Sequence, residues 1–91
     1  MSKPIERVAV VSSHFRSDLR YRIETDRKVA LRVIDLMAAI LADPFVGIGK
    51  PEPLRFELAG CWSRRVNQEH RIVYRVFGDR VEFIQARYHY E

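Results

Sequence analysis

The spacing of apolar residues changes once along the chain, and this change restricts the fold more than any other feature of the sequence. Up to Asp43 the apolar residues recur at helical intervals, whereas after Pro53 apolar and polar residues alternate as in strands with one buried face. One wide helical stripe comprises Val29, Val33, Leu36, Met37, Ile40 and Leu41. The sequence therefore predicts helices followed by a sheet, the order of an α+β fold.

Short polar segments set the limits of the predicted helices. A β-branched run over residues 8–12 predicts a strand, and a serine at 12 or 13 can cap the first helix, whose apolar stripe is Phe15, Leu19 and Ile23. Asp26 suits the N-cap of a second helix. That helix should end at Asp43, because a residue that precedes proline is pushed out of the helical region.

The second half of the chain predicts four strands, at residues 55–58, 61–67, 71–77 and 81–90. Two or three residues join each strand to the next, and connections this short imply an antiparallel meander. We therefore expect two N-terminal helices packed on one face of a small, twisted, antiparallel sheet. A chain of 91 residues forms one domain of this kind, spanning residues 1–91.

Composition limits the cellular setting and the class of partner. Cys61 is the only cysteine, which excludes an internal disulfide framework and fits a reducing cytoplasm. No apolar run reaches the ~18–20 residues of a membrane span, and no secretion signal is indicated, so we expect a cytoplasmic protein without a membrane partner. The net charge is +4, and seven of the eight basic residues after Pro44 are arginines, which favours a polyanionic partner.

Alternation in the last three strands separates a predicted core face from a predicted open face. The even positions expected to face the helices are Trp62, Val66, Ile72, Tyr74, Val76, Ile84, Ala86 and Tyr88. The odd positions expected to face outward are Ser63, Arg65, Asn67, Arg71, Arg75, Gln85, Arg87 and His89, together with the apolar Val73, Phe77, Val81 and Phe83. Arg64 interrupts the even set and is expected at a sheet edge.

The predicted register brings several arginines together on the open face. It places Arg71 opposite Arg87, with Arg65 one diagonal step away and His89 just beyond. Because like charges across a sheet repel, a bound anion would relieve this arrangement. The alternative is that nearby carboxylates neutralise the arginines: Glu57, Glu69 or Glu82.

Four short motifs carry a family resemblance. Residues 49–54 read GKPEPL, residues 60–66 GCWSRRV, residues 69–74 EHRIVY and residues 87–90 RYHY. In this order and spacing, and with the ETD and DPF segments of the helical half, the chain resembles the YoeB/Txe branch of the RelE superfamily of toxin–antitoxin mRNA endoribonucleases. The resemblance covers nearly the whole chain and implies the RelE-like microbial RNase fold.

The resemblance also implies an activity and a set of roles. Such toxins are ribosome-dependent, metal-independent endoribonucleases that cleave mRNA and inhibit translation, by attack of a 2′-hydroxyl on the adjacent phosphate. By matching motifs, Glu52 is the expected general base and His89 the general acid. Arg65 and Arg71 are expected to stabilise the phosphate, and Tyr90 to orient the reacting groups. The further basic residues expected to contact RNA are Lys50, Arg55, Arg64 and Arg87.

The same resemblance predicts the partners. They are an acidic YefM/Axe-like cognate antitoxin that covers the basic face, the ribosome with its mRNA, and a possible second copy of the chain. No cofactor is expected. The residues that could ligate zinc lack its usual spacing, so no metal site is expected either: His14, His70, His89 and Cys61.

Two other functions stay open at this point. A toxin of the same superfamily could poison DNA gyrase without catalysis, although the acid–base pair Glu52 and His89 argues against that reading. A simple RNA-binding sheet module would usually expose aromatic residues for base stacking, whereas most aromatics of the predicted strands fall on the inward positions.

Overall fold

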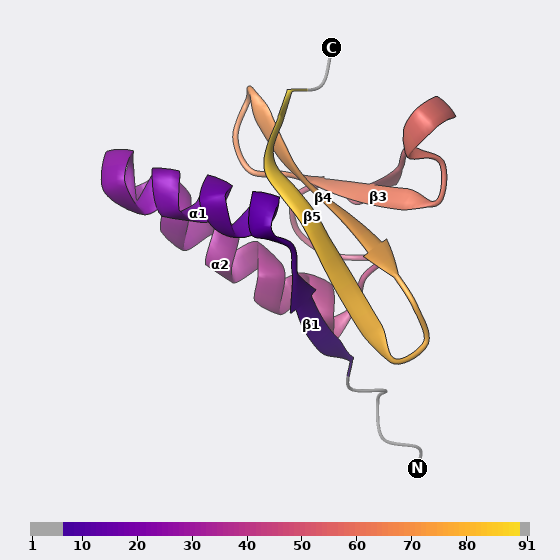
Figure 1. Ribbon diagram of the computed structural model, residues 1–91. Coiled ribbons are helices and arrows are strands. Elements are labelled where there is room, and N and C mark those ends of the chain that lie inside the picture. Colours follow the sequence, from indigo (N-terminus) through magenta and orange to yellow (C-terminus); the bar gives the residue numbers. More distant parts are fainter. Residues whose placement is uncertain (1–6, 90–91) are drawn as a thin grey trace.

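The computed structural model describes residues 7–89 and shows a five-stranded sheet with two helices on one of its faces (Figure 1). The elements are β1 (Val8–Val11), α1 (Ser13–Thr25), α2 (Arg27–Ala42), β2 (Glu52–Pro53), the 3-10 turn η1 (Phe56–Leu58), β3 (Cys61–Arg65), β4 (His70–Val76) and β5 (Arg80–His89). Tyr90 and the side chain of His89 lie outside the described part of the chain.

The helix limits agree with the sequence-based predictions because local caps define them. Ser12 precedes α1, and its side chain accepts a hydrogen bond from the Phe15 backbone N–H at 3.0 Å. Asp26 caps α2 in the same way through Val29, at 3.2 Å. The backbone leaves the helical region at Asp43, as expected for a residue before proline.

The main core lies between the helices and the sheet, and it contains the predicted α2 stripe. Its buried members are Phe15, Val33, Leu36, Ile40, Val66, Ile72, Tyr74, Val81, Phe83 and Ala86. Asp18 ties α1 to the sheet, because its buried carboxylate accepts a hydrogen bond from the Ala86 backbone N–H at 2.9 Å. The predicted α1 stripe is only partly confirmed, since Ile23 is 57% exposed.

Two features of the predicted sheet are wrong. Residues 55–58 form no strand: β2 ends at Pro53, and the chain turns at Phe56, which has a φ of 57°, into η1. The sheet, in the order β1-β5-β4-β3-β2, is also not wholly antiparallel, because β1 pairs with β5 in parallel. The helical pair separates β1 from the meander, and the sequence contains no local signal for where such a strand will dock.

The predicted alternation fails in β5. Val81 and Phe83, expected outward, belong to the main core, whereas Ile84 and Tyr88, expected inward, pack against a second apolar cluster. That cluster lies on the other face of the sheet, around Leu54, Cys61 and Val73, with Leu58 partly buried against it. The cause is a change of register between β4 and β5, which shifts the side-chain parity of β5 relative to its neighbour.

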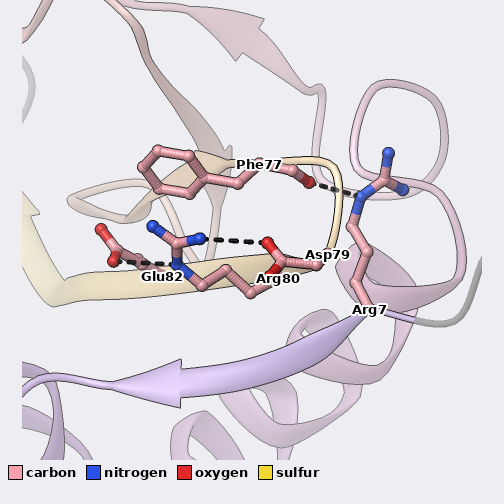
Figure 2. Close-up of polar contacts among 5 residues, drawn as sticks. All are labelled: Arg7, Phe77, Asp79, Arg80 and Glu82. Atoms are coloured by element: carbon pink, nitrogen blue, oxygen red, sulfur yellow. Dashed lines mark hydrogen bonds and ion pairs between the residues drawn. The ribbon is translucent and has the colours of Figure 1, made fainter.

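The tip of the β4–β5 hairpin fastens the first strand to the sheet (Figure 2). The Arg7 guanidinium donates to the Phe77 carbonyl oxygen at 2.9 Å, just before β1 begins. Arg80 forms ion pairs with Asp79 at 3.0 Å and with Glu82 at 3.4 Å, and its guanidinium lies 3.9 Å from the centroid of the Phe77 ring. Arg80 therefore contacts residues of its own hairpin, and it lies at the opposite end of β5 from the candidate site.

Candidate anion-binding site

One polar contact on the outer face joins three strands. Arg71 of β4 donates from Nη2 to Glu52 Oε1 of β2 at 2.9 Å, and from Nη1 to Ser63 Oγ of β3 at 3.2 Å. The pairing of Glu52 with Ser63 in the β2–β3 ladder places the carboxylate within reach. Arg71 is 5% exposed, whereas 40% of the Glu52 side chain is exposed. The fold thus brings together the expected base and one expected phosphate ligand.

Arg65 stands directly across the ladder from Arg71, and unlike Arg71 it is exposed. A juxtaposition of arginines was predicted, but with Arg87 as the partner, and that part is wrong. Arg71 pairs with Tyr88, and Arg87 reaches the helix side, where its guanidinium lies 3.8 Å from the centroid of the Tyr21 ring. Arg71 and Val73 are two residues apart in β4, whereas their partners Tyr88 and Gln85 are three residues apart in β5. The extra residue in β5 forms a β-bulge, which turns Arg87 away from Arg71.

A carboxylate does neutralise part of this arginine pair, but it is none of the three considered from the sequence. Glu52 is the partner of Arg71, and Glu82 instead pairs with Arg80 at the far end of β5. The exposed Arg65, whose Cα pairs with that of Arg71, therefore lies beside an arginine that is already held in an ion pair.

A shallow hollow adjoins these residues at the β3–β4 turn. It is open to solvent and is lined by Arg65, Asn67, Gln68, Glu69, His70 and Arg71. The turn is held by Asn67, whose Oδ1 accepts hydrogen bonds from the backbone N–H groups of Glu69 at 2.9 Å and His70 at 2.8 Å. All of the lining residues have polar or charged side chains, which suits a nucleotide rather than an apolar ligand.

Arg64 does not belong to this surface, so the expectation that it lies at an edge and contacts RNA is wrong. Its side chain is fully buried. The guanidinium donates to the backbone carbonyl oxygens of Asp43, of Val46 at 3.2 Å and of Ile48 at 3.1 Å, and to the Tyr74 hydroxyl at 3.3 Å. The even position of Arg64 in β3 was the available signal that it points inward.

The buried arginine supports the site from behind, because it holds the loop that leads to Glu52. Tyr74, its aromatic partner, donates to the Pro44 carbonyl oxygen at 2.7 Å, and burial raises the pKa of the Tyr74 phenol although the Arg64 hydrogen bond opposes this. A Cβ on Gly47 would lie 2.9 Å from Arg64 Nη1, so this loop closes tightly on the guanidinium. Arg64 is thus a structural residue that ties the loop before β2 to β3.

The remaining predicted residues are placed only in part. Lys50 and Arg55 are exposed on either side of β2. The backbone of His89 pairs with that of His70 at the end of the β4–β5 ladder.

In the described residues 7–89, no group of three or more potential metal ligands is gathered, and no helix is long and apolar enough to cross a membrane. Sequence reasoning overlooked Ser63 as a partner of Arg71, and Arg22 of α1, which contacts His70.

This arrangement of two helices and a five-stranded sheet is shared with solved structures of bacterial toxins. The structure described as a YoeB/ParE toxin from Agrobacterium tumefaciens is similar, with a TM-score of 0.85 and 41% identity over 91% of this chain and 99% of that chain. A YoeB dimer from Staphylococcus aureus also has a TM-score of 0.85, with 34% identity over 93% of this chain and 99% of that chain. These likenesses confirm the fold class expected from the sequence.

Sequence comparison narrows the class to one family. A family model described as a YoeB-like toxin of bacterial type II toxin–antitoxin systems matches residues 11–90. Toxin RelK of Mycobacterium tuberculosis is 53% identical over 73 residues, 80% of this chain and 86% of its own length. Toxin YoeB of Streptomyces coelicolor is 49% identical over 79 residues, 87% of this chain and 94% of its own length. The chain therefore belongs to the YoeB-like toxins of type II toxin–antitoxin systems.

Proposed function

We propose that this toxin is a ribosome-dependent, metal-independent endoribonuclease that cleaves mRNA and so inhibits translation. The observation that carries the proposal is the position of Arg71, which is held between Glu52 and Ser63 beside the exposed Arg65. One carboxylate and two guanidiniums therefore occupy neighbouring strands of a single sheet face. Cleavage by an internal 2′-hydroxyl needs a proton acceptor and positive charge beside the phosphorane, and these groups supply both.

The proposed reaction assigns one task to each group. Glu52 accepts the proton of the attacking 2′-hydroxyl, and its partly exposed carboxylate allows the RNA to approach. The Arg71 fork, already oriented by two partners, binds phosphate oxygens that gain charge in the transition state. Arg65 adds a second cation. Family resemblance assigns His89 as the acid that protonates the leaving 5′-oxygen and Tyr90 as an orienting residue.

Ribosome dependence is the first test. The described basic face is small, and a small face has little surface with which to position an RNA unaided. We expect the purified toxin to cut ribosome-bound mRNA far faster than the same mRNA in buffer, as measured by primer extension over a time course. Equal rates with and without ribosomes would contradict ribosome dependence. A toxin that binds ribosomes and cuts no RNA would instead be a non-catalytic inhibitor.

The proposed inhibitor is an acidic, YefM/Axe-like antitoxin that folds over the face carrying Arg65 and Arg71. A similar solved structure, 33% identical with a TM-score of 0.81, is described as a YoeB–YefM complex from Staphylococcus aureus. Charge reversal at the exposed Arg65 should weaken antitoxin binding by roughly tenfold or more, because it opposes an acidic segment at close range.

Isothermal titration of Arg65→Glu against the wild type measures this loss, and Arg16→Glu, at an exposed arginine of α1, is the matched control. The same weakening in both variants would indicate only a general effect of charge, and no weakening in Arg65→Glu would place the antitoxin elsewhere. Light scattering on the isolated toxin reports whether it also forms the homodimer that we propose from the family resemblance.

A further inference from the structure

Phe56 has the most exposed of the large apolar side chains among the described residues, at 91%. It is the first residue of η1, and its φ of 57° lies in the left-handed region that residues with a side chain rarely adopt. An exposed ring gains nothing from burial, and the backbone conformation is unfavourable, so the stability of the fold does not explain Phe56. Residues held in such conformations are concentrated at functional sites.

The chain is anchored on both sides of Phe56. Leu54 is buried and Leu58 partly buried in the apolar cluster on the outer face of the sheet. The Leu54 backbone N–H donates to the Cys61 carbonyl oxygen at 2.9 Å, and the Ala59 N–H donates to the Phe56 carbonyl oxygen at 3.0 Å. In Figure 1 this turn follows β2 and lies at the far side of the sheet from the two helices. The fold therefore holds the ring in solvent at a fixed place.

The charged neighbours of Phe56 are mostly cationic. Arg55 precedes it and is exposed. Arg75 of β4 is also exposed, and its Nη2 donates to the Ala59 carbonyl oxygen at the end of the turn, at 3.3 Å. Glu57 is the only carboxylate of η1, so positive charge is in excess. Proteins bind single-stranded nucleic acid with this combination, because the ring stacks on a base while the cations attract the backbone.

The turn adjoins the proposed cleavage site. Phe56 follows Glu52 by four residues, and four residues of chain span at most about 14 Å. Leu54 and Leu58 pack on the sheet face that carries the ion pair of Glu52 with Arg71. An RNA bound at that ion pair and continuing along β2 would therefore reach the Phe56 ring within its neighbouring nucleotides.

We propose that Phe56 stacks on one base of the mRNA close to the cleaved phosphate, and that Arg55 and Arg75 attract the backbone phosphates beside this base. The inference rests on the proposed nuclease function, since it adds a subsite for the same mRNA. Every base has a flat π face, so the subsite contributes affinity rather than a choice of base. Phe56 takes no part in the chemistry.

The substitution Phe56→Gly separates binding from folding. Glycine adopts a positive φ without steric cost, and the ring that it removes is 91% exposed. The melting temperature of Phe56→Gly should therefore equal or exceed that of the wild type. A clear fall in the melting temperature would show that the ring supports the fold, and it would overturn the proposal.

Binding is measured without cleavage on ribosomes that carry a short mRNA with 2′-deoxynucleotides in the cleaved codon, since these lack the nucleophile. Phe56→Gly should bind about tenfold more weakly, on the scale of one lost base–aromatic stack. Phe56→Trp should bind as tightly as the wild type, because indole offers a larger flat face. Ile23→Ala removes another exposed apolar side chain, in α1, and should match the wild type.

Phe56→Leu distinguishes a base from an apolar protein surface. Leucine keeps the apolar bulk but has no flat face, so this variant should lose as much affinity as Phe56→Gly. Wild-type affinity in Phe56→Leu would place an apolar segment of a ribosomal protein on this residue and would overturn the stacking role. Wild-type affinity in Phe56→Gly would overturn the subsite altogether.

A single abasic nucleotide, moved stepwise along the same mRNA, identifies the base. At one position it should weaken the wild type about tenfold and have little further effect on Phe56→Gly, because the stack is already absent. No sensitive position, or losses that add at every position, would overturn the subsite. Wild-type toxin that leaves unmodified, ribosome-bound mRNA intact would instead overturn the proposed nuclease, so the two failures are distinguishable.

Discussion

Replacing Arg71 by alanine should lower the single-turnover rate of cleavage on ribosomes by roughly 10²-fold or more, the scale of losing one preorganised charge in a transition state. Arg71 is 5% exposed and already oriented by Glu52 and Ser63, so little reorganisation is needed when the phosphate arrives. Its attraction to the phosphorane grows as negative charge develops there. The measurement is cleavage with saturating toxin, which separates chemistry from binding.

Two comparisons make the Arg71 experiment decisive. Arg71→Lys keeps the charge but loses the planar fork that reaches both partners, so it should also be slow. Ribosome affinity, titrated in parallel, should fall much less than the rate in both variants, because the other basic residues still contribute to docking. If Arg71→Ala cuts at the wild-type rate once bound, Arg71 is only a docking residue and the assignment is wrong.

Glu52→Gln should reduce the same rate by about 10²–10⁴-fold, the usual contribution of a general base. The substitution keeps the shape of the side chain and an Oε1 atom that can accept from Arg71, as Glu52 does at 2.9 Å. Arg71 should therefore stay oriented, and the loss should report the missing proton acceptor. Thermal melting of the variant, compared with the wild type, checks that the β2–β3 pairing survives.

The matched control for Glu52 is Glu57→Gln, which removes the same charge from an exposed carboxylate in η1. This variant should cleave at close to the wild-type rate. Equal losses at both positions would point to the general charge of the surface rather than to a base. Full activity of Glu52→Gln would mean that another group accepts the 2′-hydroxyl proton, and the proposed mechanism would need a different base.

The helices and the family could be recognised from the sequence because caps, apolar stripes and short motifs all lie within neighbouring residues of the chain. The caps Ser12 and Asp26 act on backbone groups three residues away, and the α2 stripe repeats within one helix. The four motifs are read directly from the chain, and the family they indicated is the one that the comparisons confirm. None of these signals depends on how distant segments meet.

The positions of the site residues depend on contacts between strands. The alternation of apolar and polar residues within one strand does not predict these contacts. The bulge in β5 brings Arg87 to Tyr21 on the helix side and turns Tyr88 outward. A bulge is an extra residue in one of two paired strands, so it cannot be recognised until the pairing of the strands is known. Arg64 was in the correct parity for burial, but its acceptors belong to a loop 16 to 21 residues away.

The sequence by itself therefore determined the helices, most of the strands and the family, because short-range hydrogen bonds and periodic burial are encoded in neighbouring residues. Only the tertiary structure decided that Arg71 pairs with Glu52 and that Arg22 holds His70. These pairs are 19 and 48 residues apart in the chain. Their meeting follows from strand register and from the packing of α1 on the sheet, which are properties of the folded chain as a whole.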